Sequence, residues 1–426
     1  MSQLPEGQLA RMGIVGSTAV RLGAREIKRR ATNPFKPHED RESASELLDE
    51  QQAVLLFQAL TKLKGTAIKL AQMLSMETDL LPEKYRRELE KSYHQVPPLN
   101  RVLVNKVFRQ EFNALPDQLF KSFESTAFAA ASLGQVHRAV IDDGTEVAVK
   151  IQYPGIHVAM DSDIKLLRKL AHTLPNKNII YESIDEIHAR LREELDYTAE
   201  AQTTHWFGSS TPLPGIEIPA VKNDWCSKRI ITTQLLDGKH LDAWLAENPP
   251  QETRNRVAQQ LYDLFIHSTL TLKCLHADPN PGNYLFRDDG TIGLIDFGCT
   301  RTFSNRFTSN LRSLLQAFEA ADKAAVFSAY ESIGMRFGRN SDDLFEEAIK
   351  PFGQWVSMPF KQDSFDFKRH KNYTNSGRDL IHRIASISDI DTMAEEFIFF
   401  DRTIYGLCKI FEKLEATVSM RQHWFQ

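Results

Sequence analysis

Two short segments in the second half of the chain carry residue types and a spacing suited to phosphoryl transfer. The first is His276–Asn283 (His-Ala-Asp-Pro-Asn-Pro-Gly-Asn) and the second is Leu294–Gly298 (Leu-Ile-Asp-Phe-Gly). In one class of phosphoryl-transfer enzymes, one Asp orients the attacking hydroxyl while an Asn and a second Asp hold magnesium. Asp278, Asn283 and Asp296 stand in that order. We therefore predict that Asp278 is catalytic and that Asn283 and Asp296 bind the metal.

The segment between Asn283 and Asp296 predicts a β-hairpin. Two apolar runs, Tyr284–Phe286 and Ile292–Ile295, flank the turn sequence Asp-Asp-Gly at 288–290. Asp-Gly between such runs favours a tight turn. The hairpin would fold the two metal-ligand positions back together.

This arrangement resembles that of protein kinases, and the matching features extend upstream. Val147–Ile151 alternates like a strand and contains Lys150, as in the Val-Ala-Ile-Lys of kinases, whose lysine contacts the nucleotide phosphates. A second predicted strand, Val136–Ile141, precedes it across another Asp-Asp-Gly turn at 142–144. We predict that Lys150 contacts ATP or ADP.

An alanine-rich segment stands where kinases carry the loop Gly-x-Gly-x-x-Gly-x-Val. Only the third glycine is kept, at Gly134. Alanine disfavours positive φ and close backbone approach, so we expect a stiffer loop than in kinases. The predicted nucleotide-binding residues of this segment are Ala129, Ala130, Ala131, Ser132, Gly134, Gln135 and Val136.

These motifs together resemble the UbiB (AarF) family of atypical kinase-like proteins. The resemblance runs from about residue 50 to the segment Arg402–Leu407. The catalytic motif has Asn280 where members usually carry His, and Lys69-Leu70-Ala71-Gln72 has alanine in place of the glycine of a Lys-x-Gly-Gln motif. The Glu-x-Asp motif of the family matches Glu194-Leu195-Asp196.

The resemblance implies roles for residues that would otherwise be assigned to a solvated helix surface. Glu42–Glu77 predicts a helix that the resemblance places over the nucleotide cleft. Its Lys69 is expected to act in catalysis and regulation, and Gln72 in regulation. Ile184–Gln202 predicts an acidic helix, from which Glu200 would pair with Lys150. The regulatory residues of that helix would be Glu194 and Asp196.

We expect an α+β, two-lobed protein-kinase-like fold with a helical N-terminal extension. The predicted parts are residues 1–100 (extension), 101–236 (small lobe) and 237–426 (helical large lobe). A strand at Ile230–Thr233 would lead into the connection between lobes, where Gln234 and Leu236 would meet the adenine. Two further helices are predicted, at Arg254–Leu275 and Ile404–Ala416. No Ala-Pro-Glu occurs, so the docking platform for a protein substrate should be missing.

Composition limits the partners. The chain has 426 residues, a net charge of -4 and four cysteines without paired or metal-type spacing. These values give no signal for nucleic acid and suit a reducing cytosol. No apolar run approaches the roughly 18 residues of a membrane span. The basic amphipathic stretch Leu9–Arg30 would contact an anionic membrane surface, pack on its own domain or form a disordered basic arm. A mitochondrial transit peptide is a further interpretation of the same residues. We expect a cytoplasmic location, peripheral to the membrane in the first case, and the oligomeric state stays open.

The leading functional hypothesis is an atypical kinase or ATPase that uses ATP and Mg²⁺. The resemblance implies a role in supporting ubiquinone or related isoprenoid-lipid biosynthesis, with an isoprenoid lipid as an expected partner. Three alternatives remain open at this point: a small-molecule kinase of the aminoglycoside phosphotransferase type, a conventional protein kinase, and a nucleotide-binding scaffold or lipid-handling chaperone with little catalysis.

Overall fold

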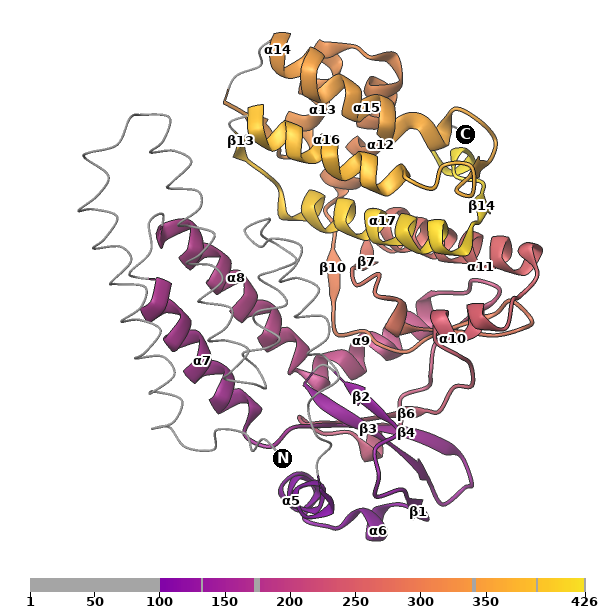
Figure 1. The fold of residues 1–426 in the computed structure, drawn as a ribbon. Helices are drawn as coiled ribbons and strands as arrows, with labels where there is room; N and C mark the ends of the chain where they lie inside the picture. Colours follow the sequence, from indigo (N-terminus) through magenta and orange to yellow (C-terminus); the bar gives the residue numbers. More distant parts are fainter. Residues whose placement is uncertain (1–99, 132, 172–176, 339–341, 388–389, 425–426) are drawn as a thin grey trace. The chain divides into compact units, whose positions relative to one another are not determined.

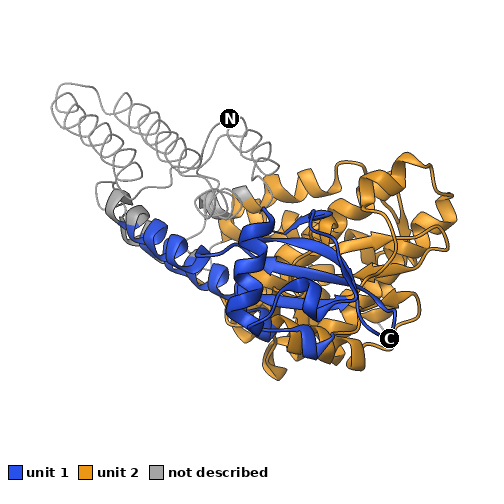
Figure 2. Cartoon of the chain, turned by 90° about the horizontal axis from the view of Figure 1, so that it is seen from below, with its two compact units in different colours: residues 1–199, 222–233 blue, residues 200–221, 234–426 orange. Residues whose placement is uncertain are grey.

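The computed structural model describes residues 100–131, 133–171, 177–338, 342–387 and 390–424 (Figure 1). The chain divides into two compact units, residues 1–199 with 222–233 and residues 200–221 with 234–426 (Figure 2). The predicted extension with its helix Glu42–Glu77, and the basic stretch Leu9–Arg30, lie outside the described residues. The three-part division made from the sequence therefore stays a prediction.

A five-stranded sheet forms the centre of the first unit. Its order is β1-β3-β4-β6, and β2 also pairs with β3. The strands are β1 Ser122–Phe123, β2 Ala129–Ala131, β3 Gly134–Val140, β4 Glu146–Gln152 and β6 Ile230–Gln234. The predicted hairpin is present: β3 and β4 are antiparallel, and their turn contains Gly144 at φ +88°. The Asp143 carboxylate accepts a hydrogen bond from the Thr145 N–H at 2.8 Å, which closes this turn.

The core of the first unit lies on one face of this sheet. Helix α5 (Arg101–Phe112) buries Val107 and Phe108, which pack in one cluster with alternate residues of β4. Val147, Val149 and Ile151 are all fully buried. Because side chains alternate along a strand, Lys150 lies on the opposite face from this core. A short helix, α6 (Pro116–Leu119), and a 3₁₀ turn, Asn223–Trp225, complete this layer.

Three further helices follow β4. They are α7 (Ile156–Ala171), α8 (Lys177–Glu194) and α9 (Tyr197–Ser210). Helices α7 and α8 pack side by side (Figure 1). Asp161 of α7 accepts a hydrogen bond from His188 of α8 at 3.0 Å, and Arg168 pairs with Asp185. The sequence predicted one helix over 184–202, whereas the structure has two helices that meet at Leu195-Asp196.

The second unit contains several small sheets of two or three strands. Strands β8 (Tyr284–Phe286) and β9 (Ile292–Leu294) form the predicted antiparallel hairpin, and β5 (Ile216–Glu217) pairs with β9 in parallel. Gly290 turns this hairpin at φ +82°. Strands β7 (Cys274–His276) and β10 (Thr300–Thr302) form a second antiparallel pair. Two further pairs are β11 (Arg336–Phe337) with β13 (Ile390–Thr392), and β12 (Phe365–Asp366) with β14 (Thr417–Val418).

Helices make up the rest of the second unit. They are α10 Leu241–Ala246, α11 Gln251–Ile266, α12 Asn305–Ala320, α13 Lys323–Ser332, α14 Asp342–Leu344, α15 Lys350–Ser357, α16 Tyr373–Ile387 and α17 Glu395–Leu414. Single turns occur at His267–Thr271, Pro281–Asn283, Phe345–Ile349, Met358–Phe360 and Arg421–His423. Only Cys299–Ser304 separate Gly298 from α12, so the described chain has no long activation segment after Asp-Phe-Gly.

The large helical core centres on α11 and α17, which pack together. One stripe of α17 is buried as core: Leu407, Ile410, Phe411 and Leu414 are at most 2% exposed. Helix α11 ends at Ile266, earlier than the predicted Leu275, because a π-helical turn and then β7 lead into the catalytic loop. An antiparallel sheet in the first unit and helices in the second confirm the α+β class.

Candidate active site

The loop that carries Asp278 is fixed at both ends by backbone hydrogen bonds. Before it, the Ala277 N–H donates to the Cys299 carbonyl at 3.0 Å, which continues the pairing of β7 with β10. After it, the Asn280 side chain accepts a hydrogen bond from the Gly282 N–H at 2.9 Å and caps the 3₁₀ turn Pro281–Asn283. The residue that replaces the family's His thus supports the loop as a cap.

Asp278 and Asn283 are brought into direct contact. The Asn283 side-chain amide donates to the Asp278 carboxylate at 2.8 Å and to the Asp278 carbonyl at 3.2 Å. With its amide nitrogen engaged in this way, Asn283 keeps its side-chain oxygen as an acceptor. Asp278 is in turn held in one orientation.

The β8–β9 hairpin brings Asp296 close to Asn283. The Ile295 N–H donates to the Asn283 carbonyl at 3.0 Å, one step beyond the pairing of Tyr284 with Leu294. One carboxylate oxygen of Asp296 accepts a hydrogen bond from the Gly298 N–H at 2.9 Å. The sequence predicted this proximity, and the register of β8 and β9 accounts for it.

The Asp-Phe-Gly segment is held by packing among aromatic rings and by a hydrogen bond from His276. The His276 ring donates through Nε2 to the Asp296 carbonyl at 2.7 Å. Its ring meets Phe297 edge to face at 5.5 Å between centroids, and Phe297 also contacts Phe207 of α9 at 5.1 Å. Phe297 is 2% exposed. The backbone around Asp296 is therefore fixed by a buried cluster of His276, Phe297 and Phe207. No role was predicted for His276 from the sequence.

The side chain of Glu200, on α9, lies near Gly298 of the Asp-Phe-Gly segment. A Cβ atom built on Gly298 would lie 4.0 Å from a carboxylate oxygen of Glu200. Glu200 itself is 5% exposed. The second unit thus gathers Asp278, Asn283, Asp296 and Glu200.

The catalytic loop also packs against the last long helix, a contact that the sequence analysis missed. A Cβ atom on Gly406 of α17 would come within 2.3 Å of the Pro279 ring. Only glycine lets the helix backbone approach the loop this closely. The signal in the sequence was the glycine inside a helical pattern, in the segment Arg402–Leu407.

The first unit holds the alanine-rich segment and Lys150. The alanines form β2 and pair with the start of β3: Ala129 with Val136, Ala130 with Gln135 and Ala131 with Gly134. A Cβ atom on Gly134 would lie 2.3 Å from the Ile151 carbonyl oxygen, so the one retained glycine is required by close strand contact. Ser132 lies outside the described residues.

A buried pair of polar side chains sits beneath this segment. The His137 ring contacts the Glu124 carbonyl through Nδ1 at 2.7 Å and the Gln135 amide nitrogen through Nε2 at 2.6 Å. A carbonyl can only accept and an amide nitrogen can only donate, so the proton is on Nδ1. Burial lowers the pKa of His137, which favours this neutral form. The ring therefore fixes the position of Gln135, one of the predicted nucleotide contacts.

Lys150 lies over an aromatic ring that the sequence analysis did not single out. Its Nζ is 5.0 Å from the centroid of the Tyr197 ring. Tyr197 is 1% exposed and opens α9. A cation above an aromatic face is attracted to it, so Tyr197 helps to hold the lysine.

The acidic motif spans a helix break. Glu194 is the last residue of α8, and Asp196 precedes α9 and accepts a hydrogen bond from the Ala199 N–H at 3.0 Å. Asp196 therefore caps α9, which explains why the single predicted helix is two helices. The regulatory roles of both residues stay predictions, as do those of Lys69 and Gln72, which lie outside the described residues.

The predicted adenine contacts follow β6. The Gln234 N–H donates to the Ala220 carbonyl at 2.8 Å. Leu236 is buried and packs near Gly293 of β9, where an added Cβ atom would meet its Cδ1 at 3.1 Å. Their contact with a nucleotide stays a prediction.

These elements define an atypical kinase-like protein: the small-lobe hairpin carries a lysine, and a hairpin in the second unit joins Asp278 and Asn283 to Asp296. Residues 91–330 match the ABC1 atypical kinase-like domain, more than half of the chain. The chain belongs to this family, and the resemblance to UbiB is confirmed.

Known relatives agree with this assignment. Atypical kinase COQ8B, mitochondrial, of Rattus norvegicus is 30% identical over 379 residues, which are 86% of this chain and 70% of that protein. Atypical kinase COQ8, mitochondrial, of Saccharomyces cerevisiae is 27% identical over 379 residues, 86% of this chain and 74% of that protein. The structure of Rv3197 from Mycobacterium tuberculosis, solved in complex with erythromycin, superposes with a TM-score of 0.63 at 25% identity, covering 90% of this chain and 96% of that one. The kinase-like fold class is thereby confirmed.

None of the described helices is long and apolar enough to cross a membrane.

Proposed function

We propose that this chain binds ATP or ADP with Mg²⁺ and transfers or hydrolyses the γ-phosphate. The observation that carries this proposal is the contact between Asn283 and Asp278 at 2.8 Å, next to Asp296. Mg²⁺ prefers oxygen ligands and is commonly bound through one or two carboxylates together with substrate phosphates. The side-chain oxygens of Asn283 and Asp296 fit that preference.

Asp278 would orient the hydroxyl or water that attacks the phosphate. Its carboxylate accepts the Asn283 amide through one oxygen, Oδ2, and Oδ1 is the atom proposed to face the nucleophile. When bound, the metal would neutralise charge on the phosphates. The chain's own contribution is positioning: the bonds that fix Asp278 and the buried His276–Phe297 cluster hold the groups before the reaction begins.

The remaining predicted residues have roles implied by the kinase-like pattern and by the resemblance to UbiB. Lys150 would hold nucleotide phosphate and pair with Glu200, as the strand lysine and helix glutamate do in kinases. The backbone of β2 and β3 would cover the nucleotide, and Gln234 and Leu236 would contact the adenine. Lys69 would act in catalysis and regulation. The other regulatory residues would be Gln72, Glu194 and Asp196.

The biological role that we propose is support of ubiquinone or related isoprenoid-lipid biosynthesis. The family membership and the resemblance to UbiB support this, together with the similarity to the COQ8 proteins. An isoprenoid lipid or an anionic membrane surface would then be a partner. The sequence stretch Leu9–Arg30 is the candidate for the membrane contact.

A scaffold or lipid-handling chaperone with little catalysis is the second candidate. The stiff β2–β3 segment favours it, since alanines replace the flexible glycines of kinases at positions paired directly to β3. In that case nucleotide binding alone would change the protein's conformation. A small-molecule kinase would instead phosphorylate added hydroxyl compounds.

Steady-state phosphate release from Mg²⁺–ATP separates these functions. We would measure it with and without anionic liposomes for the wild type, Asp278→Asn and the control Asp288→Asn, which changes an exposed residue of the hairpin turn. The proposal expects release from the wild type and the control only. Liposome stimulation would support the membrane-linked role. Release that is unchanged in Asp278→Asn would reject the catalytic assignment, and tight nucleotide binding without release would favour the scaffold.

A further inference from the structure

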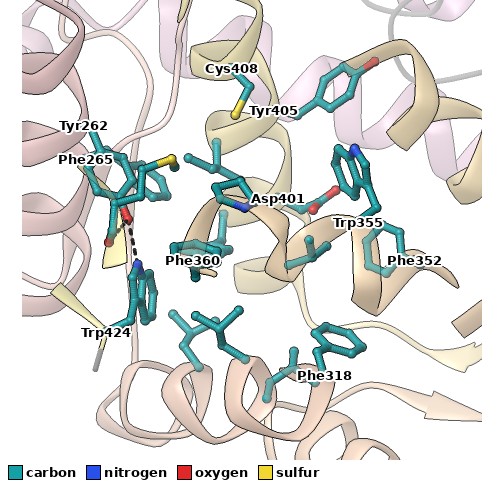
Figure 3. A pocket seen from close by; sticks show the side chains of 18 of the residues that line it. Tyr262, Phe265, Phe318, Phe352, Trp355, Phe360, Asp401, Tyr405, Cys408 and Trp424 are labelled. Carbon is teal, nitrogen blue, oxygen red and sulfur yellow. Dashed lines mark hydrogen bonds between the residues drawn. The ribbon is translucent and has the colours of Figure 1, made fainter. Parts of the chain in front are cut away.

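A cavity of about 100 Å³ lies within the second unit, among α11, α12, α15 and α17 (Figure 3). Its walls are almost entirely aromatic and aliphatic. Representative lining residues are Phe265, Leu311, Trp355, Phe397 and Ile404. Such a space suits a hydrocarbon group, since apolar cavities of this order stay dry and bind small apolar molecules.

One charged side chain interrupts this apolar wall. Of the described residues that line the cavity, Asp401 of α17 is the only one that is formally charged at neutral pH. Figure 3 labels Asp401 and Trp355 among the side chains that line the cavity. Among the described residues, none donates a hydrogen bond to this carboxylate or forms an ion pair with it.

Neighbouring polar groups in the wall have partners elsewhere. The Trp355 Nε1–H donates to the Tyr373 carbonyl at 2.8 Å, and the Tyr405 hydroxyl donates to the Thr374 carbonyl at 2.9 Å. The Trp424 Nε1–H donates to the Tyr262 hydroxyl at 2.7 Å. These donors are therefore already used, and the carboxylate of Asp401 is left to an incoming group.

Keeping a carboxylate here is costly for the fold. Burial raises the pKa of Asp401 to about 6, so the group is still mostly ionised at neutral pH inside an apolar wall. Perturbed ionisable groups that line a cavity are candidates for function. A cation would remove the penalty, because it would supply the missing opposite charge.

We propose that this cavity binds a small hydrophobic ammonium compound, with its ammonium group paired to Asp401 and its hydrocarbon part enclosed by the apolar walls. The volume of about 100 Å³ limits the enclosed part to a small ring or branched alkyl group. The ring of Trp355, which also lines the cavity, adds attraction for a cation. Anionic ligands are disfavoured by like charge, and neutral ligands lack the opposite charge that would pair with Asp401. This proposal does not depend on the proposed ATP chemistry.

Cyclopentylamine and cyclopentanol test this proposal as a matched cationic and neutral pair. Their dissociation constants would be measured by calorimetry at pH 7.5 on the full chain, for the wild type, Asp401→Asn and the control Glu395→Gln. Glu395 lies on the same helix with its side chain 72% exposed, and the control makes the same charge change.

The wild type and Glu395→Gln should bind the amine at least about tenfold more tightly than the alcohol, as expected for a charge-assisted contact. In Asp401→Asn, the two ligands should bind equally. Equal affinities in the wild type, a preference for the amine that survives Asp401→Asn, or no binding of either compound would each overturn the proposal. Thermal unfolding of all three proteins verifies that they are folded.

Discussion

The side-chain amide of Asn283 donates a hydrogen bond to the carboxylate of Asp278, its partner five positions earlier, at 2.8 Å. This bond fixes the nucleophile-orienting group and leaves the Asn283 side-chain oxygen as an acceptor for the metal. One side chain thus serves both the proposed catalytic residue and the proposed metal site.

Replacing Asn283 should therefore affect metal binding and turnover together. Loss of a group that only orients a metal ligand already lowers metal affinity by about 10- to 100-fold. We expect Asn283→Ala to raise the Mg²⁺ concentration for half-maximal phosphate release by at least about tenfold. The control Asn310→Ala removes a side chain that bonds to the Arg306 carbonyl of α12 and should change nothing. An unchanged Mg²⁺ requirement in Asn283→Ala would remove Asn283 from the metal site.

Tyr197 should contribute to nucleotide binding through Lys150. The ring lies 5.0 Å from the lysine nitrogen, and such contacts are worth about 0.5–2 kcal/mol. Tyr197→Leu should weaken ADP binding by about 2- to 30-fold, while Tyr197→Phe, which keeps the ring, should stay close to the wild type. Fluorescence titration with a labelled ADP measures this difference. Equal affinities for the Leu and Phe variants would show that the ring does not hold the lysine.

Some of this site follows directly from the sequence because the signals are local. The two Asp-Asp-Gly turns specify the β3–β4 and β8–β9 hairpins, and the second hairpin places Asn283 near Asp296. The α8–α9 break was missed, because Asp196 in an acidic helical stretch could equally be solvated or a cap. Its hydrogen bond to Ala199 decides between the two.

Other features could not be predicted because they join distant segments. Pro279 meets Gly406 across 127 positions, and nothing in either segment identifies the other. The cavity around Asp401 combines residues from Tyr262 to Trp424. In the sequence, Asp401 is merely one of several charged residues within an amphipathic helix.

The packing of Gly406 on Pro279 predicts an unusual response to alanine. Alanine normally stabilises a helix relative to glycine by about 1 kcal/mol. Here the added Cβ would lie 2.3 Å from Pro279, and overpacking costs about 1–3 kcal/mol. We expect Gly406→Ala to lower both the free energy of unfolding and ATP turnover, since Pro279 adjoins Asp278.

Gly208→Ala in α9 is the matched control for that variant. The nearest atom to its added Cβ would be Ile218 Cγ2 at 3.6 Å, an ordinary contact. This variant should be as stable as the wild type or more stable. If chemical denaturation gave the two alanine variants the same stability change, the close approach of α17 to the catalytic loop would be disproved.

The raised pKa of Asp401 predicts that the free energy of unfolding depends on pH. Its pKa of about 6 in the folded protein lies above the ordinary value of 3.8, so folding favours the protonated acid. Stability from this group is therefore present below about pH 4 and is lost as the pH rises through 6. At pH 7.5 the cost is about 3 kcal/mol.

Asp401→Asn removes that titration. Relative to the wild type, the variant should gain about 2–3 kcal/mol of unfolding free energy between pH 4 and pH 7.5. Urea denaturation at both pH values measures the change, with Glu395→Gln as the exposed control on α17. Parallel pH profiles for the wild type and Asp401→Asn would mean that the carboxylate is not buried as described.

The most direct test of the proposed function is to measure ATP binding and single-turnover hydrolysis on the same samples of wild type and Asp278→Asn. Asparagine keeps the shape of the side chain but removes the charge that orients the nucleophile. We predict ATP affinities within about threefold of each other. The hydrolysis rate in the variant should fall by at least about 100-fold. Equal hydrolysis rates, with ATP bound to both proteins, would contradict the assignment of Asp278 and with it the proposed phosphoryl-transfer site.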